Sequence, residues 1–121
     1  MGGSTYAFAQ DLFLNEGQYY TDETQTTLYT GRYTEFYEDG MLKMELQLED
    51  GRPQGTYVVY YPDGKIAEVR AYYKGQFHGT WRTYNEAGDL VAEANYRDGL
   101  KDGPWTVWND RGVLSFEMFY G

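Results

Sequence analysis

Glycine recurs at a fixed spacing of 24 residues along most of the chain. Eleven of the fifteen glycines fall into three such columns. The columns are Gly31, Gly55, Gly79 and Gly103; Gly40, Gly64, Gly88 and Gly112; and Gly51, Gly75 and Gly99. A period of this length is typical of repeat architectures, in which each unit packs mainly against its neighbours in the sequence. The spacing therefore predicts an elongated array without long-range closure.

Large side chains follow the same period. Each unit begins at a glycine of the first column and carries aromatic residues two and five positions later. The first ring column is Tyr33, Tyr57, Trp81 and Trp105, and the second is Phe36, Tyr60, Tyr84 and Trp108. Aliphatic residues follow at Leu42, Ile66, Leu90 and Leu114, and then Leu48, Tyr72, Tyr96 and Tyr120. The predicted array covers residues 31–121, divided into units 31–54, 55–78, 79–102 and the shorter 103–121.

Each unit is predicted to be a β-hairpin. A strand such as "TYVVYY" leads into "PDG", where Gly64 supplies the positive φ that a tight turn needs. A second strand, "KIAEVRAYY", leads into "KGQFHG", which we expect to form a longer turn with a glycine at each end. Asp or Asn before Gly is a strong hairpin signal, and a turn every eight or so residues excludes long helices. The sequence predicts an all-β fold, an elongated single-layer antiparallel meander.

The two ring columns lie two and five positions after the first glycine of a unit, so they are an odd number of positions apart along the strand. On a regular strand they would therefore point to opposite faces, whereas a β-bulge would bring them onto one face. The sequence leaves both arrangements open. The second strand is clearer, because alternation places Leu90, Ala92, Ala94 and Tyr96 on one face.

Residues 1–30 lack the period, and we expect them to cap the array, with Phe13 and Leu14 as the covering residues. The chain ends within a strand at Gly121, which predicts an open sheet edge at that end. Ala7-Phe8-Ala9 resembles the A-x-A end of a secretory signal, and residues 1–9 are interpreted as a signal remnant or a tag. A remnant would place the protein outside the cytoplasm, in the periplasm or secreted. Otherwise the expectation is cytoplasmic.

The repeat resembles a known family. The motif G-x-x-x-G-x-W/Y appears as "GQFHGTW", "GRPQGTY" and "GLKDGPW", and is followed by an aromatic residue, a turn glycine, an aliphatic residue and a tyrosine. This pattern resembles the MORN repeat, and in particular the bacterial MORN variant of proteins labelled YwqK-family antitoxins. Those proteins also open their array with a segment similar to residues 19–31 here. The resemblance implies protein–protein interaction, with a toxin as partner.

Composition excludes several function classes. Nineteen acidic residues against ten basic ones give a net charge of −9, which disfavours binding to nucleic acid or to acidic membranes. The chain has no cysteine, so thiolate metal sites and cysteine nucleophiles are absent. The GxSxG, HExxH and Ca²⁺-loop motifs are absent as well, and turn chemistry explains the Asp-Gly pairs. The sequence predicts no enzyme activity, no cofactor and no metal site.

Two sets of polar residues could in principle form sites. His78, the only histidine, shares its column with Gln54 and Asp102, which indicates an undemanding exposed position. Glu45, Glu93 and Glu117 share a column, but equivalent residues two strands apart lie about 9.6 Å from each other, too far to share a proton. We expect a solvated face there.

The aromatic columns are either the cross-strand core of the repeat or a binding surface. A single-layer sheet cannot bury both of its faces, so the two interpretations are compatible. Our hypothesis is a non-catalytic interaction module that binds another protein, such as a basic toxin, or a second copy of itself. The alternative is an extracytoplasmic protein that binds glycans or the cell envelope. The candidate binding residues are Tyr57, Tyr60, Trp81, Tyr84, Trp105 and Trp108.

Overall fold

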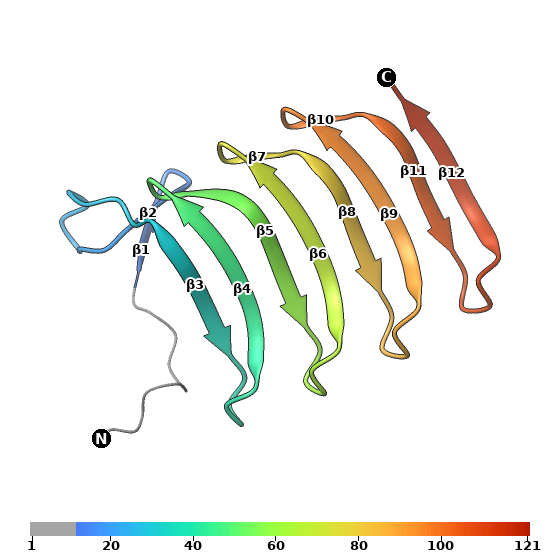
Figure 1. The fold of residues 1–121 in the computed structure, drawn as a ribbon, viewed down its shortest axis with the longest axis horizontal. Helices are drawn as coiled ribbons and strands as arrows, with labels where there is room; N and C mark the ends of the chain where they lie inside the picture. Colours follow the sequence, from blue (N-terminus) through green and yellow to red (C-terminus); the bar gives the residue numbers. More distant parts are fainter. Residues whose placement is uncertain (1–11) are drawn as a thin grey trace.

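The structure, a computed structural model, describes residues 12–121. Its main sheet is one curved layer, with successive hairpins following one another along the long axis, and a separate two-stranded sheet precedes it in the chain (Figure 1). The strands are β1 (Phe13–Asn15), β2 (Gln18–Tyr20), β3 (Gly31–Phe36), β4 (Leu42–Glu49), β5 (Arg52–Tyr60), β6 (Ile66–Tyr73), β7 (Gln76–Phe77), β8 (Gly79–Tyr84), β9 (Leu90–Arg97), β10 (Leu100–Lys101), β11 (Gly103–Trp108) and β12 (Leu114–Tyr120). Within residues 12–121, no helix is long and apolar enough to cross a membrane.

The main sheet has the order β12-β11-β9-β8-β6-β5-β4-β3, with every pair antiparallel. Because this order follows the chain, each hairpin lies next to the hairpins that precede and follow it in the sequence. The predicted single-layer meander is therefore confirmed. The tripeptide Ala7-Phe8-Ala9, considered above as a signal remnant, lies outside the described residues.

The turn between the two long strands of a unit uses its glycine as predicted. Gly64 has a φ of +93°, and its amide donates to the carbonyl of Tyr61 at 2.9 Å. The Asp63 carboxylate accepts the amide proton of Lys65 at 3.0 Å. Glycine adopts this left-handed backbone without steric cost, whereas a Cβ would be strained. The residue types of "PDG" therefore account for the turn.

The turn between units differs from the expectation of a long loop. In "KGQFHG", Lys74 and Gly75 have φ values of +51° and +82°, so the reversal takes only two residues. Two positive φ values are typical of the type I′ turn, whose twist matches that of antiparallel strands. Residues Gln76 and Phe77 then form β7, paired with Tyr73 and Tyr72. The prediction of a longer turn is therefore wrong, because part of this segment continues the hairpin ladder.

A β-bulge lies near the start of the second strand of every unit, opposite the end of the first strand. In β5 and β6, Val59 pairs with Glu68 and Tyr60 with Ile66, so Ala67 is the extra residue. The bulge nevertheless leaves the second ring column on the face opposite the first. The Tyr60 hydroxyl donates to Glu45 at 2.7 Å, and Glu45 is the register partner of Val58, which alternates with Tyr57. The question left open by the sequence is thus answered for this hairpin.

The buried core is small and lies at the N-terminal end. Met44, Leu46 and Leu48 are 8%, 2% and 3% exposed and alternate along β4. Leu12, Tyr19, Tyr29, Tyr33, Tyr57 and Val59 pack against them. One face of β4 is therefore covered, and among residues 12–121 the fully buried hydrophobic side chains all lie in this strand.

The segment before β3 contacts this core through residues other than those expected. The Tyr19 amide donates to the Gly51 carbonyl at 2.7 Å, and the Gly51 amide donates to the Tyr29 carbonyl at 2.8 Å. These bonds hold Tyr19 and Tyr29 against the core. Phe13 and Leu14 are instead 36% and 60% exposed, so their assignment as covering residues is wrong. Tyr19 and Tyr29 cover the core instead, because the backbone hydrogen bonds of the Gly51 turn hold them there. The sequence pattern does not reveal these bonds.

Candidate functional site

One face of the sheet carries a continuous row of rings, which we call the ladder. It runs from hairpin to hairpin along the array. Its ring centroids lie 6.2 Å (Tyr57–Tyr72), 5.3 Å (Tyr72–Phe77), 4.9 Å (Phe77–Tyr96), 5.3 Å (Tyr96–Trp105) and 5.4 Å (Trp105–Tyr120) apart. Trp81 joins it through Phe77 at 5.2 Å and Tyr96 at 5.9 Å. Aromatic pairs at such separations stabilise each other beyond simple burial. We call this side of the sheet the ladder face.

Arg70 is inserted into the ladder. Its guanidinium carbon lies 4.7 Å from the centre of the Tyr57 ring and 4.3 Å from that of Trp81. Its Nε donates to Glu68 Oε1 at 2.6 Å. Burial alone would lower the pKa of Arg70, but the hydrogen bond with Tyr72 and the charge of Glu68 outweigh it and raise the pKa. The cation between two rings therefore stays charged and links two successive hairpins.

A hollow of about 270 Å³ opens on the ladder face in the next hairpin. Its lining includes Trp81, Ala92, Ala94, Tyr96, Trp105 and Phe116. Ala94 is the register partner of Trp81, just as Arg70 is the register partner of Tyr57. The two alanines offer only methyl groups where neighbouring hairpins carry long side chains, so the space above them is not filled by the described residues.

The predicted binding residues divide between the two faces. Tyr57, Trp81 and Trp105 lie on the ladder face, facing Arg70, Ala94 and Met118 across their hairpins. Tyr60 lies on the opposite face, where it contacts Glu45. Tyr84 and Trp108 follow register shifts at the same place in their hairpins as Tyr60 does. The structure therefore brings together the first ring column and separates it from the second.

Burial raises the pKa of several tyrosines around the ladder. Desolvation is the main cause for Tyr57, Tyr96 and Tyr19. On the opposite face, desolvation and the hydrogen bond to Glu45 raise the pKa of Tyr60. A raised pKa means that the neutral phenol is favoured in the folded chain. These shifts therefore matter at alkaline pH, because a phenol with its ordinary pKa of about 10 is already neutral near pH 7.

The two indoles flanking the hollow are held differently. Trp105 Nε1 donates to the carbonyl of Asn95 at 3.0 Å, and Lys101 Nζ lies 4.8 Å from the Trp105 ring centre. Trp81 Nε1 is buried without a hydrogen-bond partner among residues 12–121. Ring contacts with Phe77, Tyr96 and Arg70 therefore fix Trp81.

The opposite face carries ion pairs. Arg32 Nε donates to Glu45 Oε2 at 2.8 Å, and Arg82 Nε donates to Glu93 Oε2 at 2.9 Å. These side chains are between about a quarter and a half exposed. Such pairs contribute little net stability and keep the face solvated. The sequence predicted a solvated face for the glutamate column, and Glu45 and Glu93 of that column lie in these partly exposed ion pairs.

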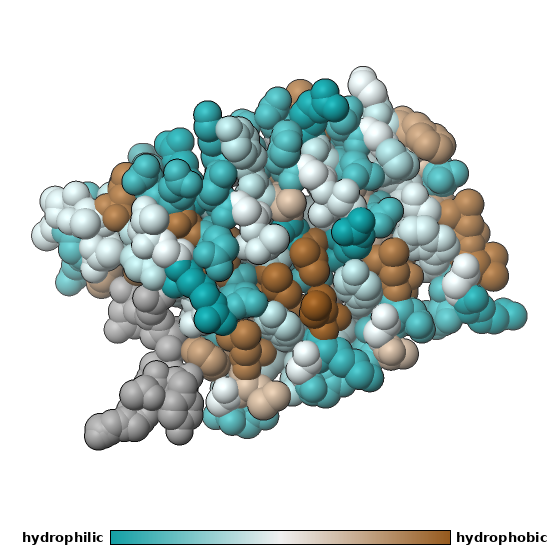
Figure 2. All heavy atoms as spheres, viewed as in Figure 1, coloured by the Kyte–Doolittle hydropathy of each residue, from teal (hydrophilic) through white to brown (hydrophobic). Residues whose placement is uncertain are grey.

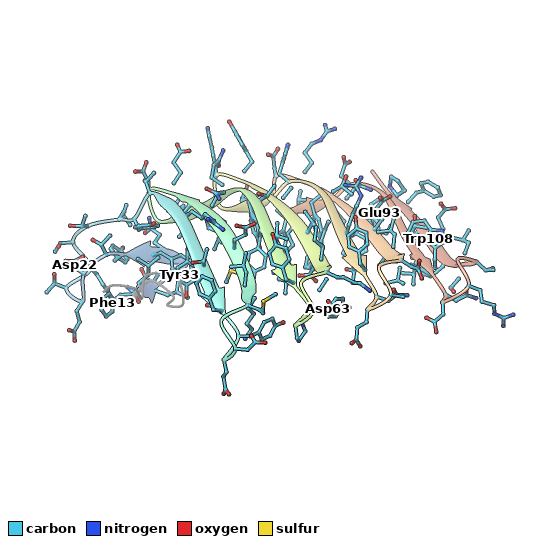
Figure 3. All side chains as sticks on the ribbon, turned by 60° about the horizontal axis from the view of Figure 1, so that its bottom comes forward. Phe13, Asp22, Tyr33, Asp63, Glu93 and Trp108 are labelled. Carbon is cyan, nitrogen blue, oxygen red and sulfur yellow. The ribbon has the colours of Figure 1, made fainter. Side chains whose placement is uncertain are left out.

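The acidic loop before β3 is arranged around Asp22. Its carboxylate accepts the amide protons of Thr26 and Thr27, both at 3.0 Å, and the hydroxyl protons of Thr24 and Thr26. These bonds, the Thr24 hydroxyl first, lower the pKa of Asp22. Asp22 lies at the opposite end of the array from Trp108 (Figure 3). The carboxylate is thus occupied by its own loop.

His78 contacts the ring of Tyr73 and the backbone of Asp98. Its Nδ1 accepts the amide proton of Asp98 at 3.3 Å, and its ring centre lies 5.7 Å from that of Tyr73. Among residues 12–121, no three His, Asp or Glu side chains are grouped so that they could hold a metal ion. The hydrogen bond ties His78 to the next inter-unit turn.

Apolar side chains are exposed along the last strand. Leu114, Phe116, Met118 and Phe119 are between 41% and 70% exposed. Hydrophobic residues are visible at this end of the molecule and also over the middle of the sheet (Figure 2). Within residues 12–121, β12 pairs only with β11, so its outer edge has no strand beside it.

Several ladder residues were not among the predicted binding residues. Tyr72, Tyr96 and Tyr120 form a repeating column, so a signal for them existed in the sequence. Arg70 had no such signal, because its column reads Leu46, Arg70, Ala94 and Met118. Its role became visible only when the rings of two hairpins were placed on either side of it.

Comparison with known families agrees with the repeat. The family described as MORN repeat variant matches residues 29–50, 53–74 and 77–98, which together make up more than half of the chain. The chain belongs to the MORN repeat variant family. The three matched segments start 24 residues apart, which is the period of the glycine columns.

Neither curated proteins nor solved structures indicate what the chain does. A search among curated proteins gave no match. Among solved structures, the chain is similar to one described as the crystal structure of accessory secretory protein 1, 2 and 3 in Streptococcus pneumoniae, with 16% identity and a TM-score of 0.42. The match covers 89% of this chain and 20% of the other. Similarity at this level says nothing of function.

Proposed function

We propose that the chain is a non-catalytic protein–protein interaction module whose ladder face binds a basic partner protein. The observation that carries this proposal is the unfilled hollow that Trp81 and Trp105 line, beside the continuous row of rings. Trp and Tyr side chains dominate the energy of many protein interfaces, especially where they line pockets. The ladder face thus offers the residue types and the shape of a binding surface.

Charge defines the class of partner. The net charge of −9 attracts a basic protein and speeds its approach. The resemblance to proteins labelled as antitoxins implies a toxin as that partner. A glycan is a poorer candidate, because the net charge of −9 gives a neutral sugar no long-range attraction, whereas it attracts a basic protein.

The proposal is tested by capture from an extract with three immobilised baits. These are the unmodified chain, Trp81→Ala with Trp105→Ala, and Tyr84→Ala with Trp108→Ala. The last variant removes the same number of rings from the second column and is the matched control. We expect one stoichiometric basic protein, retained by the first and third baits and lost by the second, that binds again after purification.

Retention of the partner by the Trp81→Ala, Trp105→Ala bait and its loss from the Tyr84→Ala, Trp108→Ala bait would overturn the assignment to the ladder face. Retention of carbohydrate alone, released by soluble sugar, would favour the glycan function. Circular dichroism of both variants shows whether the fold persists. Sedimentation velocity of the unmodified chain separates binding of a partner from self-association through the edge of β12, because a monomer excludes the latter.

A further inference from the structure

The position that faces the first ring of each hairpin differs from unit to unit. It is occupied by Leu46, Arg70, Ala94 and Met118, which are the register partners of Tyr33, Tyr57, Trp81 and Trp105. Only Arg70 places a cation there. Its guanidinium lies between the ring of its own hairpin and the ring of the next one. The protein therefore contains one filled example of an arginine between two ladder rings.

The following hairpin has the same frame without the arginine. In the next repeat, 24 residues later, Trp81 and Trp105 occupy the positions of Tyr57 and Trp81, and Ala94 occupies the position of Arg70. Ala92 occupies the position of Glu68, which pairs with Arg70. The hollow of about 270 Å³ lies at this place, lined by both indoles and both alanines. Its volume is several times the roughly 30 Å³ that one water molecule occupies in the liquid.

We propose that this slot, formed by Trp81, Ala94 and Trp105, binds an arginine side chain of the partner protein. The inference deepens the proposed function, on which it rests, by naming the group that the ladder face recognises. Trp is the strongest aromatic partner for a cation, and the planar guanidinium stacks on ring faces. The slot provides two indoles where the filled example provides one indole and one phenol.

Two further observations support a cation over an apolar side chain. Lys101 Nζ lies 4.8 Å from the centre of the Trp105 ring and 5.0 Å from that of Tyr120, so the ladder face already attracts a second cation. The chain as a whole carries a net charge of −9, which favours a cation on any exposed ring surface.

The test is a titration followed by the indole N–H resonances of Trp81 and Trp105 in the ¹⁵N-labelled full chain. The probes are short capped Gly-X-Gly peptides in which X is arginine, citrulline or norleucine. Citrulline matches arginine in shape without its charge, and norleucine is apolar. We expect saturable shifts of both indole resonances with arginine, and binding about fivefold or more weaker with citrulline and norleucine.

Variants place the binding in the slot. Ala94→Arg fills the space as Arg70 does in the preceding hairpin, and should abolish the arginine-dependent shifts. Ala87→Arg adds the same charge to an exposed turn and should leave them unchanged. If Ala94→Arg disturbs the fold, Ala94→Met, which copies Met118, fills the slot without charge and should abolish the shifts as well.

Equal binding of the norleucine and arginine peptides would overturn the proposal in favour of an apolar occupant. Absence of indole shifts with the arginine peptide would overturn it outright, and so would shifts that persist in a folded Ala94 variant. Failure of the slot differs from failure of the proposed function, because capture that depends on Trp81 and Trp105 would then persist while the peptide gave no response.

Discussion

The guanidinium carbon of Arg70 lies 4.3 Å from the centre of the Trp81 ring, across the boundary between two hairpins. The same side chain pairs with Glu68, and both are about a quarter exposed. In an array where each unit touches only its neighbours, such contacts between units decide whether the hairpins unfold together. Arg70 is therefore expected to contribute to the cooperativity of the fold.

Replacement of Arg70 by alanine should lower the free energy of unfolding by about 1–3 kcal/mol, because it removes two ring contacts and leaves Glu68 without its partner. Urea unfolding followed by tryptophan fluorescence measures the change. Arg97→Ala is the matched control, because the Arg97 side chain also pairs with a carboxylate but is 71% exposed. Its Nε lies 3.5 Å from Asp102 Oδ2. The control should change stability by less than about 0.5 kcal/mol. Equal effects of the two substitutions would refute the structural role of Arg70.

Truncation of the small core should be costly. Leu46 is 2% exposed, and Leu46→Ala removes buried methyl groups and leaves a cavity among Tyr33, Tyr57 and Met44. We expect a loss of about 2–5 kcal/mol in the free energy of unfolding. Leu100→Ala, at a position 73% exposed, should have little effect in the same urea titration. A Leu46→Ala variant as stable as the unmodified chain would mean that the segment before β3 does not cover β4.

Two glycines with positive φ should respond differently to alanine. Gly88 has a φ of +96° and open space where a Cβ would lie, so Gly88→Ala costs only backbone strain of about 1–2 kcal/mol. At Gly51 a Cβ would lie 2.7 Å from Leu28 Cδ2 and 2.8 Å from the Tyr19 carbonyl oxygen. Gly51→Ala should therefore be the more destabilising of the two in thermal unfolding. The reverse order would contradict the docking of Tyr19 on the Gly51 turn.

Stability should fall at alkaline pH. The pKa values of Tyr19, Tyr57, Tyr60 and Tyr96 are raised in the folded chain, chiefly by burial. A raised pKa in the folded state contributes stability that is fully present below the unfolded pKa of about 10. This stability is lost as the pH rises through the higher folded values, because the unfolded chain releases its protons first. Urea titrations between about pH 8 and 11 should show the decline.

The matched variant for this decline is Tyr57→Phe with Tyr96→Phe, which keeps both rings and removes two titrating hydroxyls. It should lose less stability between about pH 9 and 11 than the unmodified chain does. The same loss in both proteins would show that these hydroxyls do not cause the pH dependence.

The sequence predicted the hairpin array because its signals are local. Gly64 and its equivalents fix turns through backbone sterics, and the ring columns repeat with them. The faces of the two ring columns could not be predicted, because the sequence does not show where a β-bulge lies. The extra residue is Ala67, in the second strand of the hairpin, so the alternation of the first strand is kept. The two-residue turn at Lys74 and Gly75 was missed, since lysine seldom adopts a positive φ.

The candidate site was only partly predictable. Alternation placed Ala92 and Ala94 on one face, but nothing in a single strand indicates which rings of the neighbouring units will flank them. The contact of Arg70 with Tyr57 and Trp81 depends on the packing of two hairpins, and the residue type in its column changes from unit to unit within the chain.

The most direct test of the interaction module is calorimetric titration of the captured and purified partner into three proteins. These are the unmodified chain, Trp81→Ala with Trp105→Ala, and Tyr84→Ala with Trp108→Ala. We predict that loss of the two ladder tryptophans weakens binding by about tenfold or more, while loss of the second-column rings changes it by less than about threefold. Undiminished affinity of a folded Trp81→Ala, Trp105→Ala variant would contradict the account and return these rings to a purely structural role.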